Sequence, residues 1–165
     1  MSRLPLPTYF FALVVVRLGH RFLLVHERKH GQLFYLPAGR VEPGERLVDA
    51  ACRETMEETG VPVDIAGILR IEHTPMPDGA VRCRVFFLGH PRDDTPPKSV
   101  PDEDTLGAAW VTLEELDRYK LRGPEVRDLF EYVARGGAVY PVSLIQPEGE
   151  PWCGKRGTQP PGAAR

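Results

Sequence analysis

Apolar residues along the chain follow two different periods, and each period predicts a different kind of element. Continuous apolar runs cover residues 9–16 (YFFALVVV) and 22–25 (FLLV), which is typical of strands buried on both faces. A shorter extended stretch, QLFYLPAGR at 32–40, is interrupted by a proline and a glycine. From position 45 the spacing becomes helical, and Gly60 is placed as a left-handed C-cap. The apolar stripe of this predicted helix consists of Val48, Ala51, Cys52 and Thr55.

The second half of the chain returns to strands and ends in a helix. Residues 61–74 and 80–90 are predicted to form two strands joined by the turn PMPDG, and residues 106–112 a last core strand. A capping box of Thr112 and Glu115 opens a short helical segment, and a final helix has Pro124 in its first turn and Gly136 or Gly137 beyond its end. This order predicts an α/β (α+β) fold in which helices cover a mixed sheet.

Proline and glycine dominate the chain after position 137. We therefore expect one domain at residues 1–137 and a tail at 138–165 that is largely extended or disordered. A few apolar residues of the tail are candidates to dock as an extra strand or to contact a second subunit. They are Tyr140, Val142, Leu144 and Ile145.

Charge and cysteine content narrow the class of partner. The 165 residues include 21 basic and 23 acidic side chains, a net charge of -2, so no positive field attracts a nucleic acid polymer or an anionic membrane. A small-molecule partner is expected instead. The three cysteines lack the spacing of zinc ligands and predict reduced thiols in a cytoplasmic protein. Arg17 ends the first apolar run and no cleavage-site pattern follows, which favours a buried strand over a secretion signal.

Three glutamates crowd one face of the first predicted helix. Glu54, Glu57 and Glu58 lie at i, i+3 and i+4, where like charges destabilise a helix. None of them has a lysine at i+4. A solvated acidic face is the common meaning of such a cluster. Converging carboxylates also form an all-oxygen site suited to Mg²⁺ or Mn²⁺, which would offset the repulsion.

The glutamates belong to a longer pattern. Residues 39–61 read G-x5-E-x7-R-E-x-x-E-E-x-G-V, which resembles the signature of the MutT-like Nudix hydrolases. The fixed residues of this box are Gly39, Glu45, Arg53, Glu54, Glu57, Glu58 and Gly60. The resemblance extends from the first strand through Ala134 and implies an α/β/α sandwich with a mixed β-sheet. Thr55 departs from the aliphatic residue usual after the first glutamate; its methyl can pack while its hydroxyl bonds back one turn.

The resemblance also implies roles for individual residues. Glu54, Glu57 and Glu58 would bind Mg²⁺, with Mn²⁺ as an alternative, and the carbonyl of Gly39 and the side chain of Asp104 would be further ligands. Arg53 would orient Glu45 or one of the metal-binding glutamates. Water would attack a phosphorus, with Glu54 as the first choice of general base and Glu103 or Asp104 as the second.

Four positions are candidates for substrate contacts. Arg82 and Arg84 alternate to one face of a predicted strand, and Arg84 is the candidate for the phosphates. Phe34 and Tyr35 could flank a nucleobase, although core packing is an equal alternative for one of them. Asp102 or Asp104 could accept hydrogen bonds from a purine edge.

Several segments resemble the nucleoside diphosphate phosphatases of this family. They are LPAGRVEPGE, RVFFLGHP, DEDTLGAAW and LRGPEVRDL. The expected activity is therefore Mg²⁺-dependent hydrolysis of a small nucleotide-like diphosphate, including oxidised deoxyguanosine diphosphate (8-oxo-dGDP), by a monomer or homodimer. The alternatives are hydrolysis of ADP-ribose or thiamine diphosphate, or a non-catalytic nucleotide-binding module, which would require lost metal acids.

Overall fold

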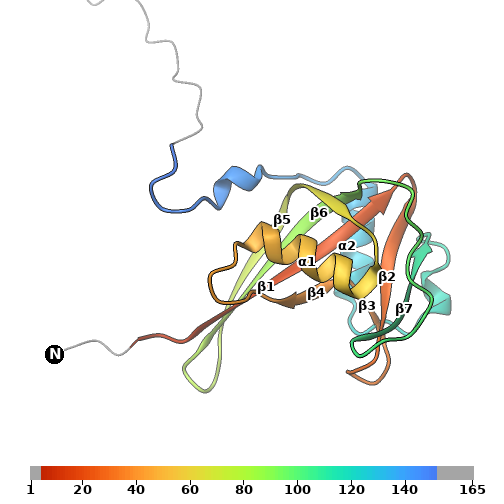
Figure 1. Ribbon diagram of the computed structural model, residues 1–165, viewed down its shortest axis with the longest axis horizontal. Helices are drawn as coiled ribbons and strands as arrows, with labels where there is room; N and C mark the ends of the chain where they lie inside the picture. The colour runs from red at the N-terminus through yellow and green to blue at the C-terminus, as the bar shows by residue number, and fades with distance from the viewer. Residues whose placement is uncertain (1–4, 152–165) are drawn as a thin grey trace, which may run out of the picture.

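The computed structural model describes residues 5–151 and consists of a mixed sheet with helices on both faces (Figure 1). The strands are β1 (Thr8–Leu18), β2 (Arg21–Glu27), β3 (Phe34–Tyr35), β4 (Ala38–Arg40), β5 (Val63–Pro75), β6 (Val81–Pro91) and β7 (Thr105–Val111). The helices are α1 (Leu47–Thr59) and α2 (Glu125–Ala134), with two 3₁₀ turns, η1 (Leu116–Arg118) and η2 (Val142–Leu144). The expected α/β/α sandwich with a mixed sheet is confirmed.

The longest apolar run of the sequence forms the central strand. β1 pairs in parallel with β6 and antiparallel with β2 and β4. β5 closes one side of the sheet against β6, and β3 and β7 both pair with β2. The main path through the sheet is therefore β3-β2-β1-β6-β5. β4 begins directly after Pro37 and pairs with β1 through only three residues, which places the chain leading into α1 beside the strand at the centre.

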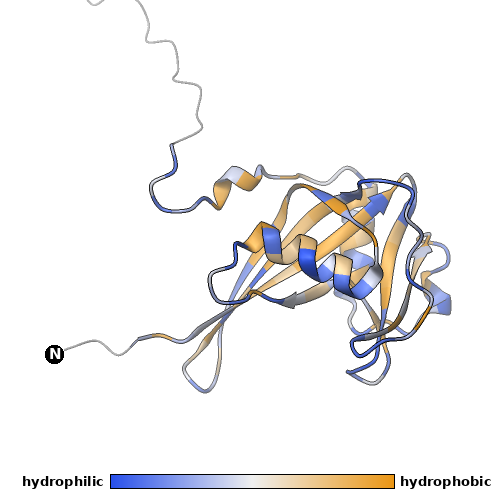
Figure 2. Ribbon diagram, viewed as in Figure 1, coloured by the Kyte–Doolittle hydropathy of each residue, from blue (hydrophilic) through white to orange (hydrophobic). Residues whose placement is uncertain are grey.

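Successive residues of β1 point into two different cores because side chains alternate along a strand. Val14 and Val16 pack with Ala50 and Ala51 of α1, in what we call the α1-side core. Leu13 and Val15 instead pack with α2, in the α2-side core, where Phe130 stacks on Phe22 with ring centroids 4.4 Å apart. The hydrophobic residues follow the central strands through the middle of the molecule (Figure 2). The run of residues 9–16 is thus continuous because both faces of β1 are covered.

α1 agrees with its predicted stripe but starts later than expected. Thr55 is fully buried, and its hydroxyl donates to the carbonyl of Ala51 at 2.7 Å, as its position in the stripe predicted. Gly60 ends the helix in the left-handed region with φ of 72°. The prediction that Glu45 lies in the first helical turn is wrong, because α1 begins at Leu47. The Glu45 carboxylate instead accepts a hydrogen bond from the Glu42 N–H at 3.0 Å and closes the loop before the helix.

The first part of the tail is docked on the sheet. Tyr140 exchanges two backbone hydrogen bonds with Ile68 of β5, of 2.7 and 2.8 Å, and Val142 and Ile145 pack against the α1-side core. Gly67 allows this crossing, because a Cβ there would lie 2.4 Å from a methyl of Val139. Residues 152–165 and Cys153 lie outside the described residues, and the boundary at residue 137 stays a prediction. No helix within residues 5–151 has the length and apolar character needed to span a membrane.

Candidate active site

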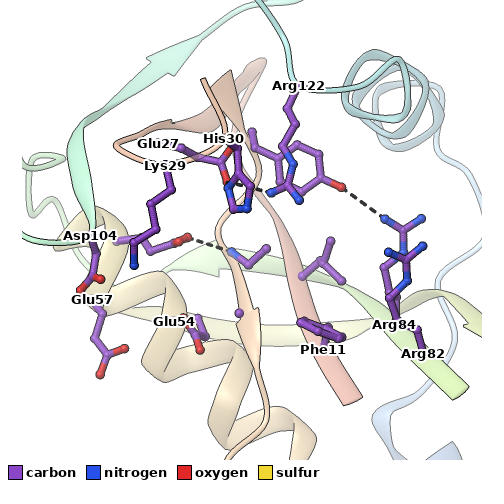
Figure 3. Close-up of a pocket in the computed structure, with 15 residues that line it drawn as sticks. Phe11, Glu27, Lys29, His30, Glu54, Glu57, Arg82, Arg84, Asp104 and Arg122 are labelled. Atoms are coloured by element: carbon purple, nitrogen blue, oxygen red, sulfur yellow. Dashed lines mark hydrogen bonds and ion pairs between the residues drawn. The ribbon is translucent and has the colours of Figure 1, made fainter. Parts of the chain in front are cut away.

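A cavity of about 520 Å³ opens where α1, β4 and the ends of β2 and β6 meet (Figure 3). Its acidic end carries Glu54, Glu57, Glu58 and Asp104. Its opposite end carries Arg82 and Arg84 from β6, and the ring of Phe11 lies between the two ends. Opposite charges are therefore separated along one cavity. This arrangement suits a ligand that carries a metal-bound anionic group at one end.

The helix and β4 together position the acidic end. The three glutamates share one side of α1, and that side faces β4 because the neighbouring stripe is buried in the α1-side core. β4 approaches the helix closely at Gly39, where a Cβ would lie 1.9 Å from the carboxyl carbon of Glu54. Only glycine leaves room there for the Glu54 carboxylate. The backbone of Gly39 and the Glu54 carboxylate are thereby brought together.

Arg53 connects the loop before α1 with the carboxylates on the helix. Its guanidinium donates to both carboxylate oxygens of Glu45, at 2.8 and 2.9 Å, a bidentate geometry that fixes its orientation. The same guanidinium donates to Glu54 at 2.8 Å and to Glu57 at 3.0 Å. The two partners that the sequence offered as alternatives, Glu45 and a glutamate of the trio, are thus both engaged by one arginine. This arrangement supports an orienting role.

Glu58 differs from its neighbours because no ion pair within residues 5–151 neutralises it. Its carboxylate accepts one hydrogen bond, from the backbone N–H of Ala38 at 2.8 Å. Burial raises the pKa of Glu58 to about 8, and the nearby charges of Glu54, Glu27 and Asp104 act in the same direction. Burial also raises the pKa of Glu54, although Arg53 opposes the shift. A cation at this end of the cavity would relieve the cost of both charges.

The acidic end fits a divalent metal by its chemistry rather than by a preformed cluster. Within residues 5–151 no three His, Cys, Asp or Glu side chains are grouped closely enough to hold a metal ion, and Arg53 pairs with both Glu54 and Glu57. The donors are nevertheless carboxylate and carbonyl oxygens, which are the ligands that Mg²⁺ prefers. Glu58, Asp104 and the Gly39 carbonyl border the same cavity. These residues could hold the ion.

The two arginines of β6 differ in how they are engaged. Arg84 donates to Glu72 Oε2 from Nε at 2.8 Å and from Nη2 at 2.5 Å, and it lies 3.5 Å from the Tyr35 hydroxyl. Its charge is thus partly neutralised inside the protein. Arg82 also lines the cavity, and its buried Nε has no hydrogen-bond partner. Arg82 therefore offers the freer donor, although the sequence favoured its neighbour.

The other predicted contacts are divided between the cavity and its surroundings. Tyr35 and Asp104 line the cavity, and the Tyr35 hydroxyl donates to Glu125 at 2.9 Å. Phe34 lies outside the lining and stacks on His26, with ring centroids 4.3 Å apart. Asp102 also lies outside it and pairs with Lys98, which holds the pKa of that carboxyl well below its usual range.

Sequence reasoning missed one wall of the cavity. Glu27, Lys29, His30 and Arg122 line it, and they come from the end of β2, the turn after it and the segment before α2. Only Glu27 left a signal in the sequence, as an acidic residue two positions after the apolar run at 22–25. Arg122 is 95 residues away along the chain and donates to Glu27 at 2.8 Å, a pairing that no local pattern predicts.

Comparisons with known proteins agree with this geometry. The model of the NUDIX domain matches residues 8–133. The chain is 33% identical over 133 residues to Phosphatase NudJ of Escherichia coli, which covers 79% of this chain and 86% of that protein. A NUDIX hydrolase from Nitrosomonas europaea superposes with a TM-score of 0.69 at 29% identity, covering 85% of this chain and 96% of the other. A MutT protein from Methanosarcina mazei superposes with a TM-score of 0.60 at 25% identity, covering 81% and 98%.

Proposed function

The chain belongs to the NUDIX hydrolase family and is a hydrolase of pyrophosphate bonds, and we propose that it cleaves nucleoside diphosphates or related small diphosphates with the help of Mg²⁺. The observation that carries the proposal is the cavity with carboxylates at one end and arginines at the other. The name of the Escherichia coli relative, a phosphatase, supports a small leaving phosphate. All three glutamates of the box are present, so nothing favours a non-catalytic binding module.

Each residue of the acidic end has a part in this proposal. Glu54, Glu57 and Glu58 would hold Mg²⁺ with Asp104 and the carbonyl of Gly39. When bound, Mg²⁺ neutralises the diphosphate and lowers the pKa of a bound water, with Mn²⁺ able to replace it.

Arg53 keeps the carboxylates oriented through Glu45. Glu54 is the proposed base because it lines the acidic end of the cavity, and burial raises the pKa of its carboxyl. Asp104 is the second choice because it borders the cavity, whereas Glu103 is exposed and outside its lining.

The arginine end supports a substrate with one nucleobase. A cavity of about 520 Å³ lies within the range of small-molecule sites, and the ring of Phe11 borders it. Arg82 lines this end of the cavity and has an Nε without a hydrogen-bond partner, and Arg84 adds a second positive charge, which suits phosphate or sugar oxygens. We propose 8-oxo-dGDP among the best substrates, with ADP-ribose and thiamine diphosphate as the alternatives to be compared.

The glutamates are tested by Glu57→Gln and Glu58→Gln, which keep volume and remove metal-binding charge. We expect kcat with Mg²⁺ to fall at least tenfold, equivalent to about 1.4 kcal/mol of transition-state stabilisation. Glu114→Gln is the matched control, because Glu114 is exposed and outside the cavity. A smaller loss in both glutamate variants would contradict their role as metal ligands.

The substrate class is tested by chromatographic analysis of the products from a panel of diphosphates, because nucleoside and thiamine diphosphates would release inorganic phosphate whereas ADP-ribose would give two phosphomonoesters. Nucleoside diphosphates, 8-oxo-dGDP among them, should exceed ADP-ribose and thiamine diphosphate in kcat/KM by about tenfold or more. Preferential cleavage of ADP-ribose would overturn the substrate while leaving the metal chemistry standing.

A further inference from the structure

Glu27 is a buried carboxylate with one oxygen unused. It is the last residue of β2, its exposed fraction is 8%, and it lines the cavity beside Lys29, His30 and Arg122 (Figure 3). Oε1 accepts hydrogen bonds from Arg122 Nη1 at 2.8 Å and is 3.2 Å from Nδ1 of His30. Oε2 is buried and has no hydrogen-bond partner. A carboxylate oxygen so placed is costly unless something that binds in the cavity supplies a donor.

The surroundings hold Glu27 rigidly. The guanidinium of Arg122 lies over the ring of Tyr35, 4.6 Å from its centroid, and the backbone N–H of Arg122 donates to the carbonyl of Phe34 at 2.9 Å. Tyr35 itself is buried and tied to Glu125. The Arg122 side chain therefore has little freedom, and its contact with Oε1 fixes which oxygen of Glu27 stays free. A pre-positioned acceptor of this kind is the usual basis of specificity toward small ligands.

The chemistry of Oε2 limits what it can recognise. An ionised carboxylate accepts hydrogen bonds and donates none, so it attracts N–H and O–H groups and repels a carbonyl or phosphate oxygen. The phosphates of a substrate are better placed at the metal-binding carboxylates of α1, where a bound cation would neutralise them. The part of a nucleotide that carries N–H donors is its base. A free amino group distinguishes guanine from hypoxanthine and cytosine from uracil.

We propose that Glu27 is a specificity-determining residue whose Oε2 accepts a hydrogen bond from an amino group on the heterocycle of the substrate. This inference rests on the proposed function and narrows it to diphosphates of amino-bearing bases. Arg122 is a positioning residue in this role, because it acts through Glu27. A role as a further metal ligand is the competing explanation, since Glu27 is near enough to Glu58 to affect the pKa of that carboxyl.

Glu27→Gln gives a directional test because Arg122 orients the new amide. Arg122 needs an acceptor, so the carbonyl oxygen of the glutamine should take the place of Oε1 and its NH₂ group the place of Oε2. The unpaired acceptor of this cavity-lining side chain then becomes a donor. The variant should therefore lose the preference for a base with an amino group over a base with hydrogen at the same position. Where the competing base carries a carbonyl at that position, the preference should be lost or reversed.

The experiment is calorimetric binding of the products GMP and IMP, and of CMP and UMP, with a chelator present so that no metal contributes. We expect the wild-type chain to bind the amino-bearing member at least tenfold more tightly in one or both pairs, and Glu27→Gln to bring that ratio to three or less. Glu114→Gln should keep the wild-type ratio. Equal binding within both pairs by the wild-type chain, which needs no variant to fold, would overturn the proposal.

Two further measurements separate the explanations. Titration with Mg²⁺ alone should give the same affinity for wild type and Glu27→Gln, and weakened Mg²⁺ binding in the variant would assign Glu27 to the metal instead. Thermal unfolding checks that the variant is folded, and Glu27→Asp, which keeps the charge but withdraws the oxygen, should also lower the binding ratio. If nucleoside diphosphates are not hydrolysed while the ratios behave as expected, the proposed activity fails and the recognition by Glu27 stands.

Discussion

Gly39 determines how closely β4 approaches the carboxylates of α1. A Cβ at this position would lie 2.0 Å from Glu54 Oε1, so Gly39→Ala must displace the Glu54 side chain. We expect kcat to fall roughly a hundredfold, because small displacements of catalytic groups have such effects, while the melting temperature changes little. Gly44→Ala is the matched control: Gly44 has φ of +81° and nothing within 4 Å of its Cβ position. It should lose about 1 kcal/mol of stability and keep its turnover. Full activity of Gly39→Ala would contradict the proposed site.

Glu58 should make the stability of the metal-free protein depend on pH. Its pKa is about 8 in the folded chain against 4.5 for an unperturbed glutamate. Between these values the folded state binds more protons than the unfolded state, so the free energy of unfolding falls as pH rises from about 5 to 8, by a few kcal/mol at most. Glu58→Gln should lack this part of the decline, and Mg²⁺ should restore wild-type stability at pH 8. Urea unfolding with a chelator present measures the free energy of unfolding of the wild type and of Glu58→Gln at each pH. Parallel pH profiles for these two proteins would disprove the assignment of the decline to Glu58.

The segment after α2 contributes to stability without reaching the cavity. Its hydrogen bonds with Ile68 and the packing of Val142 and Ile145 cover the α1-side core, but none of its residues as far as position 151 lines the catalytic cavity. Truncation after residue 137 should therefore lower the free energy of unfolding by about 1–3 kcal/mol, a few degrees in melting temperature, and leave kcat unchanged. Truncation after residue 151 is the control and should change neither.

Gly67→Ala checks that the contact with β5 carries this effect. A Cβ at Gly67 would meet Val139 and the carbonyl of Tyr140, so the substitution should destabilise the full chain. It should have a smaller effect on the chain truncated after residue 137. Equal losses in both backgrounds would show that the segment is not docked there in solution.

At the scale of the whole molecule, the sheet determines how the two helices and the cavity lie relative to one another. β1 separates the two cores, so α1 packs on one face of the sheet and α2 packs on the other. The cavity is lined by Leu13 and Tyr35 of the α2-side core and by the glutamates of α1. α2 lies outside this lining and acts through Glu125, which accepts a hydrogen bond from the Tyr35 hydroxyl. The acidic end is consequently built from one short stretch of chain, and the opposite wall from β2, β6 and the segment before α2.

Local patterns accounted for most elements and for the acidic end. The strands, both helices and the left-handed Gly60 follow from periodicity and glycine placement, because a buried face imposes its period on the sequence. The buried Thr55 with its bond to Ala51 was predicted for the same reason. The start of α1 was placed too early, since Glu45 is used by the loop and by Arg53 rather than by the helix.

The sequence by itself determined the family and the carboxylates, because Glu54, Glu57 and Glu58 are brought together by one turn of helix. Only the tertiary structure decided the rest of the cavity. In the folded chain Arg84 pairs with Glu72, Arg82 Nε has no hydrogen-bond partner, and Phe34 lies outside the lining of the cavity. The tertiary structure also joined Glu27 to Arg122 across 95 positions of the chain. Helical neighbours are fixed by a spacing of three or four residues, whereas contacts between distant segments depend on how the sheet brings its strands and loops together.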